Sequence, residues 1–127
     1  MPTSEQVRAA AERYAAAVPG GDREPIVACF AADGEVVDPY PSPAVVGHDG
    51  IRGFWDNVFA MGTPRSFTIE HIVVAGDSAA FLFSIVVAIG GGDALVGLRG
   101  FDVIRVDDDG LIAGLTAYWD PADFTPL

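Results

Sequence analysis

The sequence predicts an α+β fold in which three N-terminal helices pack on a strongly curved antiparallel sheet, forming a cone with an apolar pocket. Three observations support this prediction. Apolar residues recur at helical spacing only before about residue 62. The rest of the chain has the pattern of four long strands joined by short turns. Glycines inside the last two strands, Gly97, Gly100 and Gly114, indicate that the sheet bends.

The first two helices have clear start signals. Thr3 and Gln6 fit a capping box, and the helix that they open ends at the Pro-Gly-Gly sequence of residues 19–21. Asp22 can cap a short second helix, in which Pro25 falls in the tolerated first turn. Each helix has one apolar stripe, so the helices are expected to cover one face of the sheet.

A third helix is expected to begin near His48 and Asp49. Its apolar stripe, which matches the helical template, consists of Ile51, Phe54, Trp55, Val58 and Phe59. A short strand at 34–38 and a proline-rich loop at 39–47 precede it. The long strands are expected at 66–75, 78–89, 94–106 and 111–120, separated by GD, GGGD and DDDG turns. A curved sheet closed by helices leaves a cavity at its open end, which is a common site for an apolar ligand.

Length and charge narrow the class of protein. The 127 residues are expected to form a single domain, 1–127. The net charge is −11, with seven arginines and no lysine. This balance argues against nucleic acid, an anionic membrane surface or a polyanionic substrate, because each of these needs a cationic patch. A neutral small molecule is the expected ligand.

The chain shows no signal for export or membrane insertion. The single cysteine, Cys29, lies in an apolar run and is expected to be a buried small side chain. The N-terminal segment lacks the apolar core of a signal peptide, and the longest apolar run, at 79–90, is too short for a membrane helix. A cytoplasmic protein is therefore expected.

An aspartate lies in the middle of the predicted strand at 94–106. Alternation puts Arg99 and Arg105 on the wetter face and Asp102 on the inner face, among aliphatic residues. Tyr14 lies on the apolar stripe of the first helix, and Asp38 ends the first strand. A carboxyl group deep among aliphatic side chains resists ionisation and can donate a hydrogen bond, whereas one nearer water stays ionised and can act as a base.

Structural interpretations of the same residues remain open at this point. Tyr14 can be an ordinary core residue, and Asp38 can cap a turn before Pro39. Asp102 can form an ion pair with an arginine. A metal site is not expected, because the chain has one cysteine and no clustered histidines.

Three stretches of the chain, at 13–39, 50–58 and 101–119, carry a family resemblance. They contain a tyrosine on the first helix, Asp-Pro after the first strand, an aspartate inside a long strand, and Tyr-Trp before the C-terminal tail. The chain thereby resembles the steroid Δ5-isomerases, or ketosteroid isomerases, of the nuclear-transport-factor-2-like (SnoaL-like, cystatin-like) fold. This family is the standard example of a carboxylic acid kept neutral by an apolar site.

The resemblance implies a role for each residue. Asp38 would be the general base that moves a proton from C4 to C6 of a 3-oxo-Δ5-steroid, and Tyr14 and Asp102 would donate hydrogen bonds to O3. No cofactor is implied, and a homodimer formed through the outer face of the sheet is expected. The flat walls for a steroid are expected from aromatic residues, namely Phe54, Trp55, Phe81, Phe83, Phe101 and Trp119.

The sequence departs from the family at two positions. Where some members carry further tyrosines that support the catalytic one, this chain has Phe30 and Trp55. Two other functions remain open. The fold also hosts other acid–base enzymes, such as polyketide cyclases, whose substrates call for a more polar pocket. The protein could also be a non-catalytic carrier of lipophilic ligands.

Overall fold

The computed structural model describes residues 1–92 and 94–127, so Asp93, the last residue of the expected GGGD turn, lies outside the described residues. The helices are α1 (Ser4–Ala17), α2 (Arg23–Val27) and α3 (Gly47–Met61), with 3-10 turns η1 (Val18–Gly20) and η2 (Pro121–Asp123). The strands are β1 (Phe30–Val37), β2 (Val45–Val46), β3 (Gly62–Ala75), β4 (Ser78–Ile89), β5 (Ala94–Val106), β6 (Ile112–Tyr118) and β7 (Phe124–Pro126).

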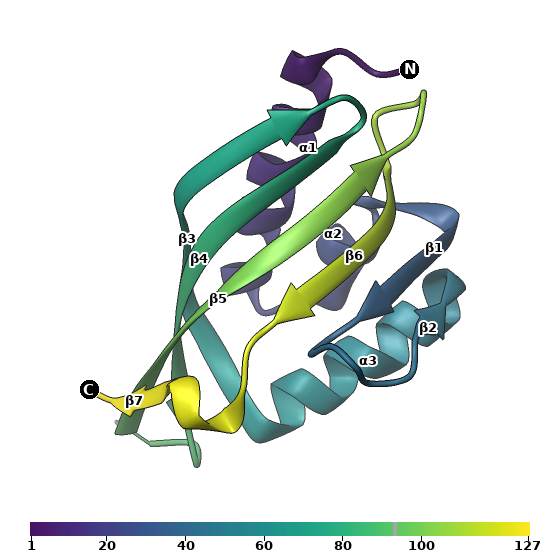
Figure 1. Cartoon of the computed structure of the whole chain (residues 1–127). Coiled ribbons are helices and arrows are strands. Elements are labelled where there is room, and N and C mark those ends of the chain that lie inside the picture. Colours follow the sequence, from purple (N-terminus) through teal and green to yellow (C-terminus); the bar gives the residue numbers. More distant parts are fainter. Residues whose placement is uncertain (93) are drawn as a thin grey trace.

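The strands form one curled sheet in the order β2-β1-β6-β5-β4-β3, and β7 pairs with the start of β5. The three helices lie against one face of this sheet (Figure 1). The expected antiparallel sheet is corrected in one respect, because β1 and β6 are parallel and the sheet is therefore mixed. A parallel pair cannot be joined by a tight turn, and the chain between β1 and β6 indeed runs through α3 and the other long strands.

The sheet curves where its ladders are irregular. The register shifts between Pro64 and Ser66 and between Ile69 and His71 on β3. It also shifts in the β5–β6 ladder, where Ala113 of β6 is the extra residue. Such bulges bend a strand and increase its twist. The long central strands therefore wrap around the helices instead of lying flat (Figure 1).

Gly100 was expected to mark a bend in the sheet, but the structure shows that it allows close packing. A Cβ atom at this position would lie 2.8 Å from the carbonyl oxygen of Tyr118 and 2.9 Å from Cζ of Phe83. The β4–β5 ladder is regular here, pairing Phe83 with Gly100. The missing side chain thus makes room for the Phe83 ring on the inner face of the sheet.

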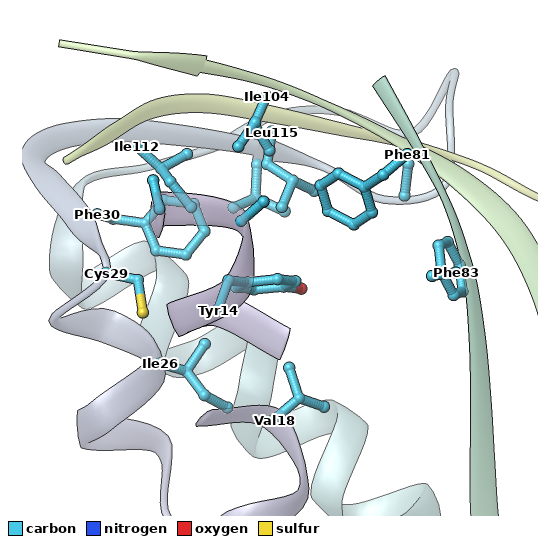
Figure 2. Packing of buried hydrophobic residues seen from close by; sticks show 14 of the residues in the cluster. Tyr14, Val18, Ile26, Cys29, Phe30, Phe81, Phe83, Ile104, Ile112 and Leu115 are labelled. Carbon is cyan, nitrogen blue, oxygen red and sulfur yellow. The ribbon is translucent and has the colours of Figure 1, made fainter. Parts of the chain in front are cut away.

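The helices are positioned by the expected local signals. Thr3 and Gln6 form the capping box of α1, and the Asp22 side chain caps α2. The buried residues of α1 and α2 meet those of the sheet in one core, in which Tyr14, Ile26 and Cys29 lie opposite Phe81 and Leu115 (Figure 2). None of the helices formed by residues 1–92 and 94–127 has the length and hydropathy needed to span a bilayer.

Candidate active site

A cavity of about 570 Å³ opens between the helices and the inner face of the sheet. It contains all three of the polar residues that the sequence singled out, Tyr14, Asp38 and Asp102. They come from α1, from the residue after β1 and from the middle of β5. The other lining residues are Pro39, Phe54, Trp55, Val58, Met61, Gly62, Phe67, Phe83, Ile85, Val87, Ile89, Val96, Leu98, Trp119 and Phe124.

Tyr14 is held by aromatic packing. Its ring makes edge-to-face contacts with Phe67, Phe30 and Trp55, at centroid distances of 5.6, 6.1 and 6.3 Å. The hydroxyl points away from Cys29, toward the side of the core where Phe83 lies (Figure 2). Burial, helped by the charges of Asp102 and Asp38, raises the pKa of Tyr14 well above its usual value. The hydroxyl is therefore a proton donor.

Asp38 is the half-buried residue that follows β1, and it has one strong partner. The indole Nε1 of Trp119 donates a hydrogen bond of 2.7 Å to its Oδ1. Burial raises the pKa of Asp38 from 3.8 to about 6, while the hydrogen bond from Trp119 acts in the opposite direction. The side chain therefore faces the cavity and is not used to cap a turn.

Asp102 is on the inner face of β5, as the strand alternation predicts, and is only 2% exposed. Burial, followed by the charge of Asp38, raises the pKa of Asp102 well above its usual value. No ion pair of Asp102 with an arginine is present among residues 1–92 and 94–127. Burial therefore favours the protonated form of Asp102, in which the carboxyl group can donate a hydrogen bond.

The Tyr14 hydroxyl and the Asp102 carboxyl group are both open to the cavity. Neither has a protein hydrogen-bond partner in the part of the chain that the structure describes. No buried polar side-chain atom of that part is both sealed from solvent and unpartnered. Two groups whose protonated forms burial favours thus face the cavity that also contains the carboxyl group of Asp38. This arrangement is suited to moving a proton next to a polarised carbonyl group.

Four of the six aromatic residues expected at the pocket line it, namely Phe54, Trp55, Phe83 and Trp119. The expectation is wrong for Phe101 and Phe81. Phe101 lies on the outer face of β5 and is 52% exposed, because alternation places it opposite to Asp102. Phe81 is fully buried in the core beside the cavity.

Two aromatic residues of the lining were not singled out in the sequence, Phe67 and Phe124. Phe67 lies on β3 and stacks on Phe83 at a centroid distance of 5.2 Å. Phe124 lies on β7 and packs against Trp119 at 5.5 Å. Phe67 could have been recognised from the alternation of its strand, whereas the tail that contains Phe124 shows no periodic pattern.

Comparison with known proteins agrees with this architecture. The model of the SnoaL-like domain family matches residues 11–115. The steroid Δ-isomerase of Nocardioides simplex is 33% identical over 120 residues, which cover 94% of each chain.

Two solved structures have the same fold. The Δ5-3-ketosteroid isomerase from a Mycobacterium species superimposes with a TM-score of 0.82 at 27% identity, covering 96% of this chain and 98% of the other. The protein RV0760c of Mycobacterium tuberculosis superimposes with a TM-score of 0.85 at 23% identity over the whole of both chains. The chain therefore belongs to the SnoaL-like, or nuclear-transport-factor-2-like, family, in the branch of the steroid Δ5-isomerases.

Proposed function

We propose that the protein is a steroid Δ5-isomerase that moves the C5=C6 double bond of a 3-oxo-Δ5-steroid to C4=C5. The observation that carries the proposal is the meeting of Tyr14, Asp38 and Asp102 in one otherwise apolar cavity. The name of the Nocardioides relative supports the same reaction.

In this proposal Asp38 is the general base. With a pKa of about 6 it is ionised at neutral pH, yet it is more basic than an exposed carboxylate. It removes the proton at C4, which the neighbouring ketone makes acidic, so the chemistry requires no cofactor. A positioned base of this kind typically contributes about 10²–10⁴ in rate.

Tyr14 and Asp102 stabilise the negative charge that develops on O3 of the dienolate. Burial raises the pKa of each group and so favours the protonated form that donates a hydrogen bond. Donors of this kind in a water-poor site typically contribute about 10²–10³ each. The protonated Asp38 then delivers its proton to C6, the C4=C5 double bond forms and the ketone is restored.

The two positions at which the chain departs from its family shape this oxyanion hole. Phe30 and Trp55 pack against the Tyr14 ring but do not accept a hydrogen bond from its hydroxyl. Tyr14 is therefore oriented by ring packing alone, and the whole donor capacity of its hydroxyl is available to the substrate.

The lining also bears on the alternative functions. A polyketide cyclase would need polar side chains along the cavity, whereas the described lining is apolar outside Tyr14, Asp38, Asp102 and the indoles of Trp55 and Trp119. A carrier of lipophilic ligands would fit the apolar walls equally well, but it would not need a base with a pKa near 6.

The test is a spectrophotometric assay with androst-5-ene-3,17-dione, following the absorbance of the conjugated enone. The wild type should isomerise it, and Tyr14→Phe and Asp102→Leu should each lower kcat by about 10²–10³. Binding of the enone product, followed by the fluorescence of Trp55 and Trp119 in the cavity, serves as the control. Tight binding without turnover by the wild type would contradict the proposal and make the protein a carrier.

The homodimer expected from the family resemblance stays a prediction. Phe101 and Tyr118 are exposed on the outer face of the sheet, where such a dimer would form. Sedimentation of the purified protein would determine the oligomeric state.

A further inference from the structure

The cavity is polar at one end and apolar at the other. Beyond Asp102, the inward positions of β5 are Gly100, Leu98 and Val96, and the facing positions of β4 are Phe83, Ile85, Val87 and Ile89. All of these except Gly100 line the cavity. The polar lining residues Tyr14, Asp38 and Trp119 belong to the Asp102 end, where the Asp38 charge acts on both proton donors.

The apolar part of the cavity is long. Val96 lies six positions before Asp102 along β5, which corresponds to roughly 20 Å of strand. The four fused rings of a steroid are shorter than this span. A steroid whose ketone contacts Tyr14 and Asp102 therefore leaves the Val96 end free for a substituent on its last ring.

The C-terminal segment extends the wall at that end. Strand β6 covers β5 only from Phe101 onward, and β7 pairs with Val96, Gly97 and Leu98. This pairing brings Phe124 into the lining. Phe124, Met61 and Ile89 are all exposed and all line the cavity, so its outer part opens to solvent between apolar side chains.

The lining of the Val96 end favours some substituents on the last steroid ring over others. A ketone or hydroxyl group on the last steroid ring would find only water at the open end and no hydrogen-bonding side chain among the described lining residues there, so the protein would add little to its binding. For an aliphatic chain, each methylene that is buried would instead make binding more favourable.

We propose that this site prefers 3-oxo-Δ5-steroids that carry an aliphatic side chain on the last ring, as in the sterols, over those with a polar oxygen there. This inference rests on the proposed isomerase function. It assigns the region around Val96, Ile89 and Phe124 as a side-chain subsite.

The test compares kcat/KM for cholest-5-en-3-one and androst-5-ene-3,17-dione at one fixed concentration of cosolvent. The wild type should favour the first substrate by at least about tenfold, since one methylene in a hydrophobic pocket can be worth about 10–200-fold. Val96→Trp, which fills the subsite, should remove this preference, because it should lower kcat/KM for the first substrate more than for the second. Val73→Trp, on an exposed position of β3 outside the cavity lining, is the matched control and should keep the preference.

The outcomes separate the two proposals. Turnover of neither substrate by the wild type would overturn the isomerase function itself. Turnover of androst-5-ene-3,17-dione with equal or higher efficiency than cholest-5-en-3-one would overturn only the subsite. A Val96→Trp variant that loses both activities equally while keeping its circular dichroism spectrum would also overturn it, because both substrates would then need the same space.

Discussion

The indole Nε1 of Trp119 donates a hydrogen bond of 2.7 Å to Oδ1 of Asp38, joining residues that are 81 positions apart in the chain. The bond opposes the effect of burial on the same carboxyl group, because it stabilises the ionised form. Asp38 therefore has both of the properties that a base needs. It is ionised at neutral pH, and it is more basic than an exposed carboxylate.

Trp119→Phe should raise the pKa of Asp38 above its present value of about 6. The acid limb of the pH profile of kcat/KM should move to higher pH by about one pH unit, since a hydrogen bond to a charged group is worth about 1.5–3 kcal/mol. Trp55→Phe removes an indole that lines the cavity without bonding Asp38 and should leave the limb in place. An unmoved limb in Trp119→Phe would contradict the role of this hydrogen bond.

Asp38→Asn should make the protein more stable than the wild type above pH 6. Burial raises the pKa of Asp38 from 3.8 to about 6, so the folded state favours the protonated form. The stability that protonation gives is complete below about pH 3.8 and is lost as the pH rises through about 6. Asparagine cannot ionise. The free energy of unfolding of Asp38→Asn should therefore exceed that of the wild type by at most about 3 kcal/mol at pH 7.5 and by almost nothing near pH 4.

Urea unfolding of Asp38→Asn at pH 4 and pH 7.5 measures this difference directly. Asp33→Asn is the matched control, because Asp33 is exposed on β1, and its effect should stay within about 0.5 kcal/mol at both values of pH. The same gain for Asp38→Asn at both pH values would mean that ionisation of Asp38 does not oppose folding.

Asp102→Leu and Asp102→Asn should differ in activity far more than in stability. Leucine removes the proton donor and should lower kcat by about 10²–10³, whereas asparagine keeps an N–H donor and should retain part of that rate. Neither change breaks a protein hydrogen bond within the described residues, so neither should destabilise the fold by more than about 1.5 kcal/mol. Steady-state kinetics and thermal unfolding of both variants are the measurements. Equal loss of kcat in the two would contradict the donor role.

Gly100→Ala should disturb the cavity through packing. The new Cβ would lie within 3 Å of the Phe83 ring and of the Tyr118 carbonyl oxygen, so overpacking should cost about 1–3 kcal/mol and displace Phe83. Gly53→Ala in α3 is the control. Its Cβ meets nothing within 4 Å, and alanine should stabilise the helix by about 0.5–1 kcal/mol. Chemical denaturation of both variants measures these opposite effects.

Much of the fold could be predicted from periodicity. The three helices and the four long strands occur close to their expected positions, because each pattern is long and each helix carries start or stop signals. The parallel pairing of β1 and β6 could not be predicted, since it depends on how two segments that are far apart in sequence meet. Strand β7 was missed for the same reason, because its hydrogen bonds go to β5 and its own three residues have no alternation.

The candidate site, like the fold, could be predicted only in part from the sequence. The inward position of Asp102 followed from strand alternation alone, and the same alternation points Phe101 outward. Choosing Phe101 as a ligand contact relied on its aromatic character and was wrong for that reason. The bond between Trp119 and Asp38 and the contribution of Phe124 depend on tertiary contacts that no local pattern encodes.

The most direct test of the central claim is turnover of androst-5-ene-3,17-dione by Asp38→Asn beside the wild type and Asp33→Asn, with the affinity for the enone product measured in parallel. The proposed role of Asp38 predicts that Asp38→Asn loses at least about 10²-fold in kcat with unchanged affinity, while Asp33→Asn matches the wild type. Full turnover by Asp38→Asn would contradict it and remove Asp38 as the base.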